Sequence, residues 1–224
     1  MPGAPGRAQR PRPTGPLRPA WRAFRGTVTR PGRTFEGLAD DPHAGRHGAL
    51  VLLAVCAVYT LILLAFLGRG YPAATGSALG LAPEGQYGVQ VWYQAPLFFA
   101  VTAATSAVLA LMSRLSGHPA GLGLAFGRIS LATAVPFALT TMVVEAAAAL
   151  LVAAGLVAPA DLLRWLTDPG AWFALLYQVI GLAWLAALVM VATRTTLRRG
   201  WPVSAPAGLL LLVVYGTPVA LLVR

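Results

Sequence analysis

The sequence predicts an all-α integral membrane protein, a bundle of five transmembrane helices with its N-terminus in the cytoplasm and its C-terminus outside. Three observations predict this class. Hydrophobic residues make up 57% of the 224 residues and charged residues only 11%, which is outside the range of ordinary soluble domains. Five apolar runs are long enough, at about 1.5 Å per helical residue, to cross a hydrocarbon core of about 30 Å. The arginines lie mainly in the segments expected on one side of these runs.

Two segments precede the first apolar run. Residues 1–20 are mostly Pro, Gly, Arg and Ala, a composition that predicts a disordered cytoplasmic tail. Residues 21–47 form a predicted juxtamembrane amphipathic segment, because aromatic and aliphatic side chains recur there at helical spacing between arginines. This segment is the predicted interaction arm, and its candidate contact residues are Trp21, Phe24, Pro31, Thr34, Phe35, Leu38 and Pro42.

The transmembrane domain is predicted over residues 48–223. Residues 70–90, rich in Gly, Ala and Pro, are expected to form a loop, and residues 158–170 to form a polar break. Pro136 is expected to kink the third span, because proline removes a backbone hydrogen bond. The five predicted spans cover residues 48–68, 91–113, 129–157, 171–193 and 205–223.

The basic residues predict the orientation. All 17 are arginine, and with the N-terminus inside, 14 of them fall on the cytoplasmic side and three outside. Arg128 is counted among the 14 as a cytoplasmic charge just before the third span. The arginine-only, Ala-rich and Gly-rich composition suggests a GC-rich bacterial genome, so we expect a multi-pass protein of the bacterial plasma membrane. The net charge of +10 is explained by this distribution, and no nucleic-acid binding is expected.

Glu145 is the candidate functional residue, since an acid in a membrane span needs a partner, a proton or a function. It lies on a stripe of small residues, typical of a helix-packing face, and is therefore expected to point into the bundle. Its candidate polar neighbours are Thr102, Thr141 and Tyr59. Two interpretations stay open: a protonated acid that holds helices together, which we favour, or a proton or cation site.

No metal, cofactor or catalytic site is predicted. Asp40, Asp41, His43 and His47 have metal-ligand side chains, but Pro42 and a nearby glycine are expected to disrupt the helix that would align the histidines. The glycine-rich stretch 121–127 lacks the preceding strand of a nucleotide-binding loop, so close backbone approach is its expected role. Hydrolysis in the membrane would need histidine ligands or a second acid within the spans, and the sequence offers neither.

Three local patterns resemble one family. They are the Pro31–Leu38 segment followed by Asp41-Pro42, the glycines 121, 123 and 127 before the third span, and Trp172–Leu175 with Trp184 in the fourth. Together they are similar to prokaryotic members of the Yip family, five-span membrane proteins whose eukaryotic members interact with Rab GTPases. The resemblance implies a non-enzymatic membrane protein. The acidic-Leu-Tyr-Gly-Pro motif of many eukaryotic members is missing, so binding of a Rab-type GTPase is not expected.

The sequence therefore predicts a non-enzymatic scaffold or interaction protein that organises other membrane proteins or lipids through its arm. The bilayer and other membrane proteins are the expected partners. The alternative is a small transporter or proton-coupled channel that uses Glu145 as its coupling charge. The scaffold is favoured because transporters usually contain internal repeats, and these five unequal spans show none.

Overall fold

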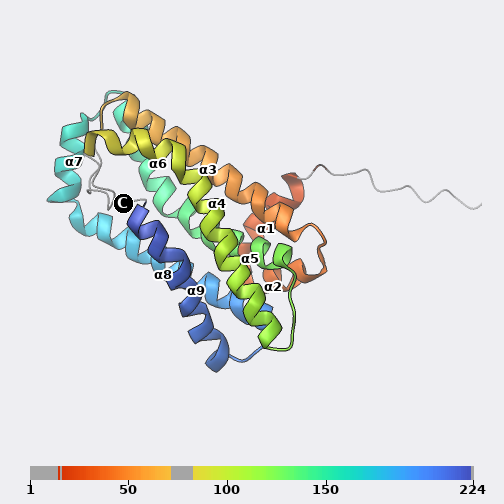
Figure 1. Cartoon of the computed structure of the whole chain (residues 1–224). Coiled ribbons are helices and arrows are strands. Elements are labelled where there is room, and N and C mark those ends of the chain that lie inside the picture. Colours follow the sequence, from red (N-terminus) through yellow and green to blue (C-terminus); the bar gives the residue numbers. More distant parts are fainter. Residues whose placement is uncertain (1–14, 16, 72–82, 223–224) are drawn as a thin grey trace, which may run out of the picture.

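The computed structural model describes residues 15, 17–71 and 83–222, and the regular elements in these residues are all helical. Five helical stretches are long and apolar enough to cross a membrane, and they lie together as a bundle (Figure 1). The predicted five-helix bundle of a multi-pass membrane protein is therefore confirmed. The spanning helices are α3 (Ala44–Gly68), α4 (Pro83–Leu115), α5 (Leu122–Leu139) continued by α6 (Thr141–Ala153), α8 (Ala171–Leu197) and α9 (Trp201–Leu222).

Short elements cover the two ends of the bundle (Figure 1). One end, which we call the arm end, carries α1 (Leu17–Thr29), α2 (Pro31–Gly37) and a 3-10 turn (Leu38–Asp40). The opposite end carries α7 (Pro159–Thr167) and the end of α9. An odd number of spans separates the arm from the end of α9, as the predicted topology requires. That the arm end faces the cytoplasm stays a prediction from the arginines.

The closest helix crossing joins α3 to α5 at the arm end. A Cβ atom placed on Gly127 would lie 2.5 Å from the carbonyl oxygen of Ala44, and one on Gly48 would lie 2.7 Å from the Cα of Gly127. Small residues let membrane helices approach until their backbones touch. The close approach expected of the glycine-rich stretch is present, but the stretch itself is helical from Leu122, not a loop.

The arm is fixed to the bundle by a buried arginine of α5. Arg128 is only 2% exposed. Its Nε and Nη2 donate hydrogen bonds to the carbonyl oxygen of Phe35, at 2.9 and 2.6 Å, and its Nη1 donates one to the hydroxyl of Thr196 at 2.8 Å. One side chain thus joins α2, α5 and α8. The expectation that Arg128 precedes the third span is wrong, because it lies within α5, where these acceptors hold it inside the helix packing. That it lies on the cytoplasmic side stays a prediction.

The spans differ from the predicted limits in ways that have physical causes. The second span begins at Pro83 instead of residue 91. Three glutamines in its first part face inward, so this polar stretch can belong to the helix. The first begins at Ala44, four residues early, so Gly45 lies within a helix. The polar break expected at 158–170 contains the short helix α7. The third span ends at Ala153 and not at residue 157, since Gly155 has a φ of +70°, in the left-handed region that ends helices.

The third span is interrupted at Thr140, four residues after the expected kink at Pro136. The backbone N–H and the hydroxyl of Thr140 both donate to the carbonyl oxygen of Pro136, at 2.9 and 2.7 Å. Gly181 of α8 lies against this point, where an added Cβ would be 2.7 Å from the hydroxyl oxygen of Thr140. The interruption therefore coincides with a close approach of α8.

The predicted tail, residues 1–20, lies largely outside the described residues, and residues 17–20 form the first turn of α1. Helix α1 has three faces. Ala20, Ala23 and Thr27 are buried, whereas Leu17 and Trp21 are 71% and 63% exposed. The remaining face carries exposed arginines. The helix therefore packs with its small residues and leaves an aromatic and aliphatic face beside an arginine face.

Candidate functional site

A cavity of about 390 Å³ lies inside the bundle, and helices α3, α4, α5, α6, α8 and α9 all contribute to its wall. Gln86 enters from the first turn of α4, and Ala220 from the last turn of α9, so the cavity lies toward the end opposite the arm. We call it the Glu145 cavity. The polar residues of its wall are Tyr59, Gln86, Tyr87, Gln90, Thr133, Thr140, Thr141, Glu145, Tyr177, Gln178 and Tyr215.

Glu145 is half-buried on this wall. The side chain of Tyr59, from α3, is hydrogen-bonded to it. Thr141, one helical turn before Glu145, lines the same cavity. Thr102 does not line it: this side chain is buried on α4, and its hydroxyl oxygen has no hydrogen-bond partner among the described residues. The structure thus brings Tyr59 and Thr141, but not Thr102, to the acid.

The position of Glu145 along its span also matters for function. It lies 8 residues before the end of α6 at Ala153 and 23 residues after the start of α5 at Leu122. The acid is therefore in the half of the span that lies away from the arm. If the arm end is cytoplasmic, as the arginines predict, the acid is closer to the outer surface.

A row of glutamines on α4 was not anticipated from the sequence. Gln86, Gln90 and Gln94 follow one another at four-residue intervals, which places them on one helix face. They are 2%, 2% and 0% exposed. The Oε1 atom of Gln86 and both amide atoms of Gln94 have no hydrogen-bond partner among the described residues. Burying an amide without a hydrogen-bond partner costs free energy. The inner face of α4 therefore carries amide groups that could still bind a polar partner.

Aromatic rings enclose the two ends of the cavity. On the side away from the arm, Tyr87 stacks on Phe66, which also stacks on Tyr71. Burial raises the pKa of Tyr71, which lies beyond the end of α3, to about 12, so its hydroxyl stays protonated at neutral pH. Toward the arm, Phe137 packs edge-on against Tyr59, with centroids 4.9 Å apart.

Tyr215 closes the cavity toward the arm end as well. Its side chain is buried and hydrogen-bonded to Thr133 of α5. The hydroxyl of Thr133 itself donates to the carbonyl oxygen of Ile129 at 2.9 Å. Among the described residues that line it, the polar wall therefore ends in a pair of hydroxyl groups and does not continue as a row of charged groups toward the arm.

The predicted interaction arm is divided by burial. Phe35 and Leu38 are buried, at 0% and 5% exposure, and so hold the arm on the bundle. Trp21 is exposed and stacks on Phe24, with ring centroids 5.4 Å apart. The other three residues are local to the arm. Pro31 starts α2, Thr34 lies in the middle of α2 with its hydroxyl donating to the carbonyl oxygen of Arg30, and Pro42 lies exposed before α3.

The residues considered for a metal site have other local roles. Asp41 precedes α3, where one carboxylate oxygen accepts the backbone N–H of His43 at 2.8 Å. Its other carboxylate oxygen is 2.7 Å from Nδ1 of His47. Asp40 lies apart, in a pocket at the arm end. In the described part of the chain no group of three or more metal-ligand side chains comes together.

Sequence patterns held only part of the information needed to find this site. Glu145 stands out as an acid in an apolar run, but Gln86, Gln90, Tyr177 and Gln178 carry no charge. The four-residue spacing of the α4 glutamines was a usable signal, but Gln86 and Gln90 fell in the segment 70–90, which was expected to be a loop, and Gln94 alone fell in a predicted span.

No protein-family model, no curated protein and no solved structure matches this chain. The resemblance to the Yip family stays a prediction from the sequence, and the function is inferred from the geometry of the site.

Proposed function

We propose that this chain is a non-enzymatic membrane protein that binds a small cation, or a proton, in the Glu145 cavity and lets it cross the bilayer. The observation that carries this proposal is the placement of Glu145 on a cavity wall together with glutamine amides and tyrosine rings. A carboxylate supplies the opposite charge, amide oxygens replace part of a hydration shell, and aromatic faces attract cations. This is the transporter or channel alternative, with Glu145 as the coupling charge.

The cavity geometry favours this function over a purely structural acid. A packing acid needs only neighbours that satisfy its hydrogen bonds, and Tyr59 supplies such a bond. It does not need a cavity of about 390 Å³ with polar groups from several helices. Pockets that bind small ligands have volumes from about 300 Å³ upward and a few convergent polar groups. The interruption at Thr140 also lies on this wall, and interrupted spans are typical of transport sites.

Glu145→Gln is expected to abolish cation-dependent flux while the protein still inserts and accumulates normally. Glutamine keeps the shape and the ability to hydrogen-bond to Tyr59 but loses the charge. The measurement uses liposomes that contain the purified protein and are exposed separately to gradients of protons, Na⁺, K⁺ and ethylammonium. A pH-sensitive dye inside them reports proton movement, and a potential-sensitive dye reports the charge carried by the other cations.

Asp161→Asn is the matched control, because it also replaces an acid by an amide, but this acid is exposed and lies on α7, outside the cavity. Its flux should equal that of the wild type. If no gradient gives flux above that of protein-free liposomes, and Glu145→Gln only lowers the unfolding temperature, the proposal fails and the acid is structural.

We propose a second function for the arm, that of a scaffold surface that binds anionic lipid. The exposed aliphatic and aromatic face of α1, with Leu17 and Trp21, lies beside a face of exposed arginines. Such a helix fits the headgroup region, where the apolar face enters the boundary and each arginine adds about 1 kcal/mol of attraction to anionic lipid. If the chain organises other membrane proteins, as the sequence predicts, it would contact them through this surface.

A spin label at Leu17→Cys is expected to be buried at headgroup depth in nanodiscs that contain phosphatidylglycerol. The label is introduced in a Cys56→Ala background, because Cys56 is the chain's one cysteine. The accessibility of the spin label to oxygen, compared with its accessibility to a water-soluble nickel reagent, gives its depth in the bilayer. Thr29→Cys, on the arginine face of the same helix, is the control and should stay more accessible to nickel. Equal nickel accessibility at both positions would contradict a lipid-binding role for this face.

A further inference from the structure

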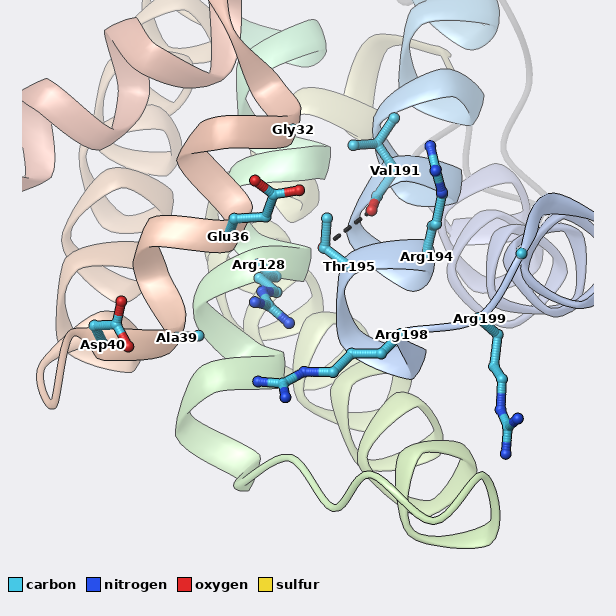
Figure 2. A pocket seen from close by; sticks show the side chains of 11 residues that line it. Gly32, Glu36, Ala39, Asp40, Arg128, Val191, Arg194, Thr195, Arg198 and Arg199 are labelled. Carbon is cyan, nitrogen blue, oxygen red and sulfur yellow. Dashed lines mark hydrogen bonds between the residues drawn. The ribbon is translucent and has the colours of Figure 1, made fainter.

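A second cavity, of about 640 Å³, lies at the arm end between α2 with its following turn and the end of α8 (Figure 2). We call it the arm-end pocket. It is separate from the Glu145 cavity, and the two share no lining residue. Its charged residues are Arg128, Arg194, Arg198 and Arg199 on one hand, and Glu36 and Asp40 on the other.

Arg128 brings a buried positive charge to this pocket, where Glu36 attracts it electrostatically without forming an ion pair with it. Its three hydrogen bonds go to neutral acceptors, the carbonyl oxygen of Phe35 and the hydroxyl of Thr196. In the described residues no carboxylate lies within ion-pair distance of it. Buried charges in proteins are ordinarily paired. Of the five N–H donors of a guanidinium, the three bonds leave one on each terminal nitrogen.

Arg198 adds a second guanidinium at the same place. Figure 2 shows its side chain extending from the end of α8 into the pocket, below Arg128. The two charges are close enough to repel each other. Arg198 also has a φ of +51°, a left-handed conformation that is costly for a residue with a side chain. The backbone N–H of Arg198 donates to the carbonyl oxygen of Arg194 at 2.9 Å, but among the described residues its guanidinium has no hydrogen bond or ion pair.

The other two arginines of the pocket have contacts of their own. Arg194 lies over the ring of Trp201, with its guanidinium carbon 4.7 Å from the ring centroid. Arg199 donates to the carbonyl oxygen of Ser116 at 2.7 Å and points away from Arg128 in Figure 2. Arg198 and Arg128 are therefore the pair left to face a ligand.

We propose that the arm-end pocket binds a phosphate group between Arg198 and Arg128. Two guanidinium forks match the oxygens of a phosphate and would exchange their mutual repulsion for charge-assisted hydrogen bonds. The phosphate comes either from an anionic lipid headgroup or from a soluble phosphate compound, since the pocket lies at the end of the spans and its volume suits either. This inference is independent of the cation function proposed for the Glu145 cavity.

The test measures the unfolding temperature of the full chain in a maltoside detergent without phosphate. One series of samples receives inorganic phosphate and a second series receives short-chain phosphatidylglycerol. Each is compared with a sample that contains chloride at equal ionic strength. At least one of the two ligands should raise the unfolding temperature of the wild type. A rise with the lipid alone identifies a headgroup, and a rise with inorganic phosphate identifies the soluble source. Both outcomes support the site, and no rise with either ligand overturns it.

Variants fix the position of the site. Arg198→Gln should weaken the apparent affinity about tenfold or more, the loss expected for a hydrogen bond to a charged group. Glu36→Gln should strengthen it, because an acid of the pocket lining is removed. Arg33→Gln makes the same charge change as Arg198→Gln on an exposed residue of α2 outside the pocket, and its affinity should stay within twofold of the wild type. If Arg33→Gln and Arg198→Gln weaken binding equally, the effect is one of net charge and the site is wrong.

Discussion

Gly127→Ala is expected to destabilise the folded bundle by about 2 kcal/mol or more, although it adds a single methyl group. The added Cβ would lie 2.5 Å from the carbonyl oxygen of Ala44 and 2.7 Å from its carbonyl carbon. Both atoms belong to the backbone of α3, which cannot move away as the end of a flexible side chain can. The α3–α5 crossing must therefore separate, and the packing of both helices loosens.

Gly123→Ala is the matched control for this prediction. It is the same substitution in the same helix, four residues earlier, and a Cβ there would meet no atom within 4 Å. Because alanine favours a helix over glycine by up to about 1 kcal/mol, this variant should be as stable as the wild type or slightly more stable. Unfolding in mixed micelles of increasing dodecyl sulfate content measures the difference. Equal midpoints for the two variants would contradict the crossing.

The spanning helices could be predicted because, in a bilayer, the length of an uninterrupted apolar segment largely determines whether it forms a transmembrane helix. The first span was predicted to begin at residue 48 and the fourth to end at 193, each four residues from the observed limit. The start of α4 was missed by eight residues. A hydropathy pattern averages over all faces of a helix, and Gln86, Gln90 and Gln94 lower that average even though they point inward.

The Glu145 cavity could be predicted only at its one charged lining residue. An acid in an apolar run is visible in the sequence. Tyr59, on the neighbouring first span, was an expected partner of this acid, and the structure brings the two side chains together. The cavity itself depends on how six helices are arranged around the interruption at Thr140. The expected position of the kink, at Pro136, followed from the missing N–H of proline. The close approach of Gly181 at Thr140 is a tertiary contact, and no local pattern contains it.

Arg128 was misplaced for a similar reason. A charge one residue before an apolar run is normally a flank of the span, and Arg128 precedes residue 129. Its main acceptor is a backbone carbonyl 93 residues earlier in the chain, at Phe35. Every residue has a backbone carbonyl, so a sequence carries no signal for this partner. Glu145 is consequently not the only charged side chain held among the apolar spans.

Arg128→Lys is expected to release the arm from the bundle while the five spans stay folded. Lysine keeps the positive charge, but its three donors share one nitrogen and so cannot reproduce the guanidinium fork, whose three nitrogens reach the carbonyl of Phe35 and the hydroxyl of Thr196 from separate positions. Losing two hydrogen bonds from a charged donor should cost about 3 kcal/mol or more. The loss falls on the docking of α2, because Phe35 is held there by its carbonyl as well as by its buried ring.

Hydrogen exchange resolved by mass spectrometry separates this local release from global unfolding. In the variant, amides of α2 should exchange at least tenfold faster, whereas amides in the middle of α3 should keep their protection. Arg194→Lys is the matched control, because it is the same substitution at the same end of the bundle, and Arg194 is exposed and contacts Trp201 instead of the arm. Its α2 amides should exchange as in the wild type. Unchanged exchange in Arg128→Lys would mean that the buried ring of Phe35 alone holds the arm, and equal acceleration in α2 and α3 would mean that Arg128 stabilises the whole bundle.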